Sequence, residues 1–290
     1  MSVLDESAHR SDPAGWVGVV AGDGELPGAM VQAALARGLG VVVVELDMGQ
    51  PRRHGETSIG PSLEGRVHAY RLSPADWERV VETFCRHGVR AVYAAGKVNR
   101  VAASALFEQA AAGEGRALYE QGRFLEDQDL SRLFAEALER RGIRLGSQHE
   151  LLGHLLAQPG VLTRRAPDAR ETADIEIGRR LAREVAALDI GQTVVVRHGT
   201  VLAVEASAEG TDATIRRAGR LAGPGSVVVK VSRPDQDLRF DTPVIGPDTL
   251  RAMRAARASC LAVEAHRCLL LHRERVVRAA DRAGIAIVAF

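Results

Sequence analysis

The fold of this chain is decided by the stretch WVGVVAGDGELPG, residues 16–28, in which an apolar run ends in a glycine-rich turn. Trp16–Ala21 has the pattern of a buried strand, and a helix is predicted to follow the turn as far as about Arg37. A strand, a glycine turn and a helix in this order are typical of the first βα unit of a Rossmann-like domain. The amino terminus of such a helix offers free N–H groups and a positive dipole end to a phosphate.

The segments that follow continue the same alternation. Gly40–Leu46 is almost all valine, which is typical of a parallel strand buried on both faces. We therefore predict a Rossmann-like parallel sheet in a nucleotide-binding domain over residues 15–157, after a disordered leader at residues 1–14. Its other predicted elements are strands Arg66–Leu72 and Val89–Ala95, and helices that end at Gly88, begin after Arg100, and span Asp127–Arg141.

A second domain is predicted after residues 158–169, which hold two prolines and are interpreted as a linker. The pattern of residues 170–290 predicts a smaller mixed α/β domain, which we expect to be the catalytic domain. The expected fold class is therefore α/β throughout. Cys260–Val263 and Cys268–Leu271 are interpreted as a pair of strands joined by a turn. The other predicted elements are helices Thr172–Leu188, Thr211–Leu221, Pro247–Arg257 and Arg273–Gly284, and strands Thr193–Arg197, Thr200–Glu205, Ser226–Val231 and Ile285–Phe290.

Composition excludes several classes of protein. The net charge of +1 predicts no nucleic-acid partner. No apolar run approaches the roughly 18 residues of a membrane span, and no signal peptide is recognisable, so we expect a cytoplasmic protein. Cys85, Cys260 and Cys268 form no CxxC pair and are interpreted as reduced, buried thiols.

Two turns at the ends of predicted strands are candidates for binding a phosphate-bearing ligand. The first contains Gly22 and Gly24; the second contains Gly96, Lys97 and Asn99. Of the 38 basic residues only Lys97 and Lys230 are lysine, which suggests positions where a compact charge is needed. The alternatives are a purely structural tight turn and a solvated helix entry.

The second domain offers a larger set of polar residues. Glu205 ends a valine-rich strand, and Thr211 or Asp212 is expected to cap the next helix. The amides at the start of that helix could bind an anion, and the alternative is that these residues serve only as the helix cap. Lys230 lies in an apolar strand, where an ammonium is costly unless an anion pairs with it. The loop that follows carries Asp235, Asp237 and Asp241, which are oxygen ligands of the kind that magnesium uses beside phosphates, or else members of surface ion pairs.

Six motifs together resemble one known family, the UDP-2,3-diacylglucosamine pyrophosphatases of the LpxI type. They match in order over nearly the whole chain, from about residue 16 to residue 290. The motifs are GVVAGDGELP at 18–27, AGKVNR at 95–100, LDIGQ at 188–192, VLAVE at 201–205, EGTD at 209–212 and RFDTPVIG at 239–246.

The resemblance implies a magnesium-dependent hydrolase of lipid A biosynthesis. Such an enzyme converts UDP-2,3-diacylglucosamine to 2,3-diacylglucosamine 1-phosphate (lipid X) and UMP, with water attacking the phosphate next to the sugar. The family's essential aspartate falls on Asp241, which would hold Mg²⁺ or take the proton of water, and Lys230 and Gln236 are carried over as its neighbours. A UDP-linked glycolipid is the implied partner, and peripheral contact with the inner membrane and a homodimer stay open.

Two other classes of function are kept as alternatives. The glycine turn, with Glu45 or Asp47 about twenty residues further on, would also suit a nucleotide- or dinucleotide-binding oxidoreductase. A non-catalytic UDP-glycolipid-binding protein would retain the binding residues and tolerate replacement of Asp241. No zinc motif, GxSxG sequence or Walker A sequence is present.

Overall fold

The computed structural model describes residues 15–48, 65–98, 127–206 and 209–290. It contains two compact units, Met1–Gly146 and Ser147–Phe290. The predicted leader at residues 1–14 and the helix predicted after Arg100 lie outside the described residues. No helix among the described residues combines the length and the apolar character needed to cross a membrane.

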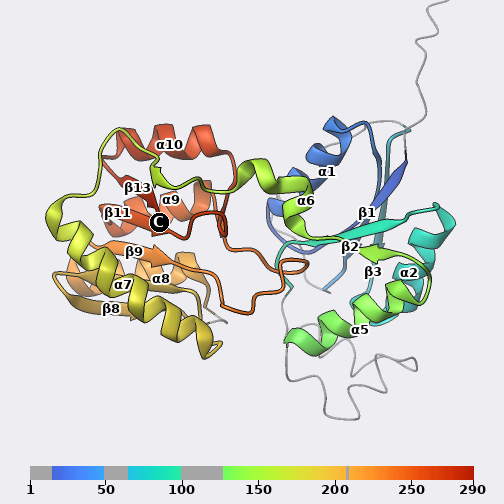
Figure 1. Ribbon diagram of the computed structural model, residues 1–290, viewed down its shortest axis with the longest axis horizontal. Helices are drawn as coiled ribbons and strands as arrows, with labels where there is room; N and C mark the ends of the chain where they lie inside the picture. Colours follow the sequence, from blue (N-terminus) through green and yellow to red (C-terminus); the bar gives the residue numbers. More distant parts are fainter. Residues whose placement is uncertain (1–14, 49–64, 99–126, 207–208) are drawn as a thin grey trace, which may run out of the picture. The chain divides into compact units, whose positions relative to one another are not determined.

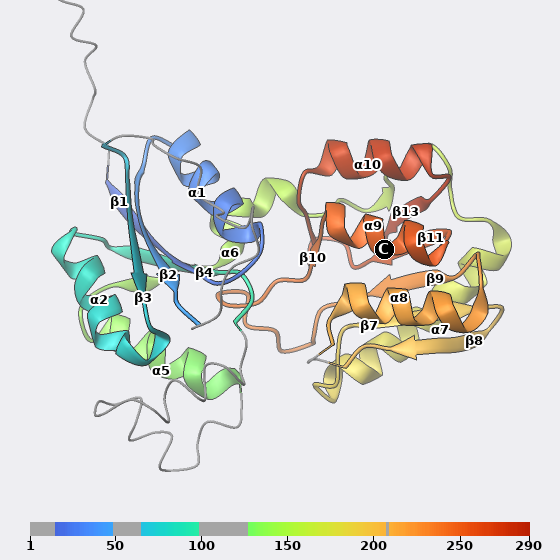
Figure 2. The same ribbon diagram turned by 180° about the vertical axis from the view of Figure 1, so that it is seen from behind.

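The first unit is built on a five-stranded parallel sheet in the order β3-β2-β1-β4-β5. From β1, the chain moves outward through β2 and β3, then returns to β4 on the other side of β1. Helix α1 packs on one face of the sheet, while α2 and α5 lie together on the other (Figures 1 and 2). The elements are β1 Trp16–Ala21, α1 Leu26–Ala36, β2 Gly40–Leu46, β3 Val67–Leu72, the 3₁₀ turn Pro74–Asp76, α2 Trp77–Arg86, β4 Ala91–Ala95, α5 Asp127–Glu139 and β5 Arg144–Leu145.

The second unit is built on a six-stranded mixed sheet in the order β6-β13-β11-β9-β7-β8. Strands β9, β11 and β13 run parallel, whereas β6, β7 and β8 are joined to the sheet by antiparallel pairing. The elements are α6 Gln148–Leu152, the 3₁₀ turn Gly153–Leu155, β6 Gly160–Val161, α7 Ala169–Ala187, β7 Thr193–Arg197, β8 Thr200–Val204, α8 Thr211–Ala222, β9 Val227–Lys230, β10 Val244–Ile245, α9 Pro247–Ala256, β11 Cys260–Val263, β12 Leu269–Leu270, α10 Arg273–Arg282 and β13 Ala286–Ala289.

Alternation along the central strands creates two apolar cores in this unit. Val228, Leu261 and Ile287 point to the face covered by α8, α9 and α10. Val229 and Ala262, one residue further along their strands, point to the face covered by α7. Because successive side chains of a strand point to opposite faces, a sheet covered on both sides needs apolar residues at every position, as the valine runs provide. The fold class is therefore the predicted α/β class.

Two features of the second unit differ from expectation. Part of the predicted linker, residues 158–169, is attached to the sheet: β6 within it pairs with β13, and the Ile287 amide donates to Thr163 Oγ1 at 2.9 Å. The predicted pairing of the strands around Cys260 and Cys268 is wrong, since β11 lies in the large sheet and β12 pairs with β10. Apolar patterning marks both segments as buried, but it does not identify their strand partners.

The three cysteines are free, as predicted, although only two are buried. Burial raises the pKa of the Cys260 and Cys268 thiols to about 12, so both stay protonated at neutral pH. Cys85 is half-buried instead.

Candidate active site

The two predicted turns of the first unit lie at the carboxyl ends of β1 and β4. These strands are neighbours at the point where the strand order reverses, which is where open α/β sheets bind ligands. The predicted position of Gly22, Gly24, Gly96 and Lys97 at the carboxyl ends of these strands is therefore confirmed, while their role in binding stays a prediction. Asn99 lies outside the described residues.

Backbone hydrogen bonds hold these two turns together. The Asp23 amide donates to the Lys97 carbonyl at 2.9 Å, and the Lys97 amide donates back to the Asp23 carbonyl at 2.8 Å. A Cβ atom at Gly22 would lie 2.5 Å from the Lys97 carbonyl oxygen, and one at Gly96 would lie 2.7 Å from the carbonyl carbon of Gly22. Gly24 has open space around it, but its φ of +102° favours glycine. The three glycines thus have structural reasons, and their contact with a ligand stays a prediction.

Lys230 is the central residue of the candidate site in the second unit. It ends β9 beside Thr193, the first residue of β7, and its side chain is buried. The Lys230 ammonium donates to Thr211 Oγ1 at 2.6 Å. Among the described residues, that is its one hydrogen bond, and no carboxylate lies within ion-pair distance of it. Because an ammonium has three N–H donors, this buried group retains the capacity to bind an anion.

Thr211 joins Lys230 to Glu205, which follows the last residue of β8. The Thr211 hydroxyl donates to Glu205 Oε1 at 3.1 Å and lies 3.2 Å from the Thr193 hydroxyl. The expectation that Thr211 or Asp212 caps α8 is wrong, because Gly210 is the N-cap and leaves the first-turn amides without a capping side chain. Thr211 instead orients Lys230, and Asp212 lies in the acidic first turn of the helix.

Asp241 lies half-exposed in the loop after β9, and a single oxygen takes its hydrogen bonds. Asp241 Oδ2 accepts hydrogen bonds from the side-chain amides of Gln236 and, at 3.3 Å, Gln192. Arg233 Nη2 lies 3.8 Å from the same oxygen. The Gln236 amide is oriented in turn, since its Oε1 accepts from the Arg233 backbone at 2.8 Å. Oδ1 carries no hydrogen bond to any described residue.

Gln192 connects the Lys230 and Asp241 groups and was not among the predicted site residues. Its backbone amide donates to Glu205 Oε2 at 3.3 Å, and its carbonyl accepts from the Val231 amide at 3.0 Å. Together with its side-chain bond to Asp241, these contacts form one continuous network from Lys230 to Asp241. The available signal was the position of Gln192 at the end of the LDIGQ motif, directly before a valine strand.

The three aspartates of the loop do not gather into a metal cage. Asp237 pairs with Arg239 at 2.7 Å, and this hydrogen bond lowers the pKa of the Asp237 carboxyl. Asp235 is exposed. No cluster of three or more histidine, cysteine, aspartate or glutamate side chains suited to a metal occurs among the described residues. Mg²⁺, however, often uses one or two carboxylates with water and substrate phosphates, and Asp241 fits that arrangement.

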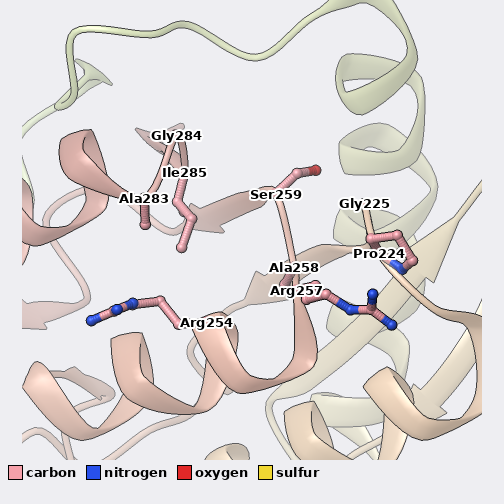
Figure 3. Close-up of a pocket in the computed structure, with 9 residues that line it drawn as sticks. All are labelled: Pro224, Gly225, Arg254, Arg257, Ala258, Ser259, Ala283, Gly284 and Ile285. Atoms are coloured by element: carbon pink, nitrogen blue, oxygen red, sulfur yellow. The ribbon is translucent and has the colours of Figure 1, made fainter.

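A cavity of about 490 Å³ lies at the other end of the strands (Figure 3). Its lining precedes β9, β11 and β13, whereas Lys230 lies at the carboxyl end of β9. Figure 3 shows its two arginines, Arg254 and Arg257, pointing away from each other. The cavity therefore offers no converging charge and none of the predicted residues. It is lined by Pro224, Gly225, Arg254, Arg257, Ala258, Ser259, Ala283, Gly284 and Ile285.

Comparison with known proteins agrees with the order of the motifs. A model of the LpxI N-terminal domain matches residues 16–155, and a model of the LpxI C-terminal domain matches residues 158–288. The UDP-2,3-diacylglucosamine pyrophosphatase LpxI of Caulobacter vibrioides is 32% identical over 282 residues, which are 94% of this chain and 96% of that protein. A match to the solved structure of a candidate epimerase from Burkholderia cenocepacia J2315 covers 97% of this chain and 95% of the epimerase chain, at 11% sequence identity. Its TM-score of 0.30 is too low to support any argument. None of these matches supports the oxidoreductase alternative, and Asp47, one of the acids it needed, pairs with Arg71 at 3.0 Å.

Proposed function

We propose, from the premise that the chain belongs to the LpxI family, that it hydrolyses the pyrophosphate bond of UDP-2,3-diacylglucosamine. The products are 2,3-diacylglucosamine 1-phosphate (lipid X) and UMP, and the reaction belongs to lipid A biosynthesis. The observation that carries this proposal is the buried Lys230 ammonium, which has one hydrogen bond among the described residues and shares a network with Asp241.

A diphosphate ester suits this arrangement because its charge must be neutralised and a water molecule positioned before the anhydride breaks. Lys230 supplies a fixed positive charge, and the amino terminus of α8, which begins at Thr211 and has no capping side chain, adds backbone N–H groups. In the proposed reaction, the oxygen of water bonds to the phosphorus next to the sugar. The bridging oxygen leaves with UMP, and the water proton passes to Asp241 or to solvent.

The sequence left two alternative roles for Asp241, metal ligand and general base. Either role would use Oδ1, the oxygen that carries no hydrogen bond to the described residues. Gln192, Gln236 and Arg233 hold the other oxygen and so fix the direction of Oδ1. Magnesium, when bound, would neutralise phosphate charge and polarise the scissile bond. Gly22, Gly24, Gly96, Lys97 and Asn99 are proposed to contact the substrate, as are Glu205, Thr211, Asp212 and Gln236.

One assay tests the reaction and the role of Asp241. Purified protein is incubated with UDP-2,3-diacylglucosamine and Mg²⁺ in H₂¹⁸O, and UMP and lipid X are analysed by mass spectrometry. We expect UMP to be released and the label to enter lipid X. Asp241→Ala should abolish turnover while leaving substrate binding measurable by calorimetry. Near-native turnover of that variant would remove Asp241 from the mechanism, and an absence of UMP with the native protein would refute the reaction itself.

Peripheral membrane contact and dimerisation are part of the same proposal. A diacylated substrate resides in a membrane, so the protein should sediment with vesicles that contain it. Analytical ultracentrifugation at several protein concentrations tests for a homodimer; a constant monomer mass would exclude that state.

A further inference from the structure

We infer that the α7–β7 turn, residues 188–192, is where the protein contacts the acyl chains of its glycolipid substrate. This inference rests on the proposed function. The turn coincides with the LDIGQ motif, and its contact with acyl chains is assigned by no comparison and by no predicted site residue.

The α7–β7 turn is attached to the loop that carries Asp241. The Asp189 carboxylate pairs with the Arg233 guanidinium, whose other terminal nitrogen lies 3.8 Å from Asp241 Oδ2. Three residues along the turn, Gln192 Nε2 donates to the same oxygen at 3.3 Å. These two connections place the turn directly beside the carboxylate that is proposed to act on the diphosphate.

The turn is held in one conformation by its backbone. The Ile190 amide donates to the Val185 carbonyl at 3.2 Å and the Asp189 amide to the Ala186 carbonyl at 3.1 Å, which is the Schellman pattern at a helix end. Asp189 occupies the left-handed position of this motif with φ of +54°, where glycine is usual. At Gly191, a Cβ atom would lie 2.1 Å from the Glu205 carbonyl oxygen, so the turn lies directly on the end of β8. Because its backbone is fixed at these points, the turn presents the side chains of Leu188 and Ile190 in defined positions.

The side chains that this turn exposes are aliphatic. Leu188 is 71% exposed and Ile190 is 46% exposed. A Schellman motif commonly buries the residue at the Ile190 position against the helix, so its exposure here runs against the usual packing. The other large hydrophobic side chains exposed in the described part of the second unit are Val161, Val201 and Leu221, and none of them lies in the α7–β7 turn or in the network of Asp241.

The chemistry of the substrate accounts for exposed aliphatic groups at this position. UDP-2,3-diacylglucosamine carries its acyl chains on the sugar that bears the diphosphate. A protein that holds the diphosphate between Lys230 and Asp241 must therefore meet those chains within a few bond lengths. Arg233 pairs with the carboxylate of Asp189, which lies between Leu188 and Ile190 in the sequence, and apolar contact there removes hydrocarbon from water.

The test compares substrates with long and short acyl chains. Leu188→Ser and Ile190→Ser are combined in one variant, and Leu221→Ser is the matched control because Leu221 is 65% exposed at the end of α8, outside the network. The measured quantity is the ratio of kcat/KM for the long-chain substrate to kcat/KM for its diacetyl analogue, both in detergent. We expect this ratio to fall about tenfold in the double variant, as partial burial of two aliphatic side chains predicts, and to stay unchanged in the control.

Each outcome separates this inference from the proposed function. An inactive native protein refutes the proposed function. An active native protein whose ratio is unchanged in the double variant refutes the acyl-chain contact alone. Equal losses in the double variant and in Leu221→Ser also overturn the inference, because they would reflect general surface hydrophobicity. A loss seen only on vesicles, with none in detergent, would assign the turn to the membrane surface instead.

Discussion

Replacing Lys230 by methionine should inactivate the protein and at the same time make it more stable. Methionine has a similar length, but it carries neither the charge nor the N–H donors of lysine. The described structure gives the buried ammonium one hydrogen-bond partner, Thr211, and no ion pair. In the absence of substrate such a group destabilises the fold, and we propose that in its presence the same group binds the phosphate.

The magnitude follows from the hydrogen bonds of the ammonium. Removing a buried donor that has no partner raises the free energy of unfolding by about 1–3 kcal/mol. Losing the hydrogen bond to Thr211 lowers it by roughly 1 kcal/mol. The net gain in the free energy of unfolding is then about 0–2 kcal/mol, which raises Tm by up to about 6 °C for a unit of this size. Removing one preorganised donor from a site of developing charge should lower kcat by about 100- to 1000-fold.

Circular dichroism measures Tm, and release of UMP measures kcat for the same preparations. Arg216→Met is the matched control because Arg216 is an exposed cation on α8, and it should leave both quantities unchanged. A Lys230→Met protein with lower Tm and lower kcat would refute the reasoning, since Lys230 would then be a structural residue with a partner in the folded state.

Three further perturbations address three features: the hydrogen-bond network of Asp241, the crossing of the two turns that contain Gly22 and Gly96, and the pH dependence of stability. Gln192→Leu removes the donor to Asp241 and should lower kcat about tenfold with little change in KM, measured by steady-state kinetics. Gly22→Ala places a Cβ atom 2.5 Å from a carbonyl oxygen and should destabilise the first unit by about 2–3 kcal/mol in urea unfolding. Glu171→Gln should destabilise the second unit by about 1 kcal/mol at pH 7, because it breaks the part-buried ion pair with Arg165, whose side chain is 38% exposed, and this difference should disappear in acid.

The sign of the last effect follows from the direction of the shift. Burial raises the pKa of the Glu171 carboxyl, but hydrogen bonds from Arg165 and its other partners outweigh burial and lower it. A lowered pKa contributes stability above the unfolded value of about 4.3, and that stability is lost as the pH falls through the folded value.

Each of the three predictions has an outcome that contradicts it. A Glu171→Gln difference that persists after the Glu171 carboxyl of the folded protein is fully protonated would contradict the linkage argument. Gly15→Ala, at a position with no atoms within 4 Å, is the control for Gly22→Ala, and equal losses would show that the crossing is not responsible. For Gln192→Leu, a change confined to KM would assign Gln192 to substrate binding.

Local patterns made the sheets and one edge of the candidate site predictable. Valine runs such as Gly40–Leu46 indicate strands covered on both faces, and both sheets contain such strands. Lys230 was predictable because a charge inside an apolar strand needs a compensating partner. The positions of Gly22 and Gly96 followed from the rule that ligand-binding turns follow parallel strands, although their tight backbone contact did not.

Contacts between distant segments were out of reach of the sequence pattern. Gln192 and Asp241 are 49 residues apart, and no local signal announces that one amide holds the other carboxylate. The pairing of β6 with β13 likewise depends on two residues in a segment rich in proline and arginine. Periodicity reports whether a residue is buried, while the choice of neighbour is settled by packing of the whole unit.

The reciprocal backbone hydrogen bonds between Asp23 and Lys97 hold two turns of the first unit together without using the side chains of these residues. Main-chain groups alone close this crossing, so its integrity depends on the glycines beside it and not on the side chains at positions 23 and 97. Both side chains are exposed and can be exchanged without loss of the crossing. Substitutions at these two positions are thus expected to change the surface chemistry of this edge of the sheet while the scaffold beneath it stays intact.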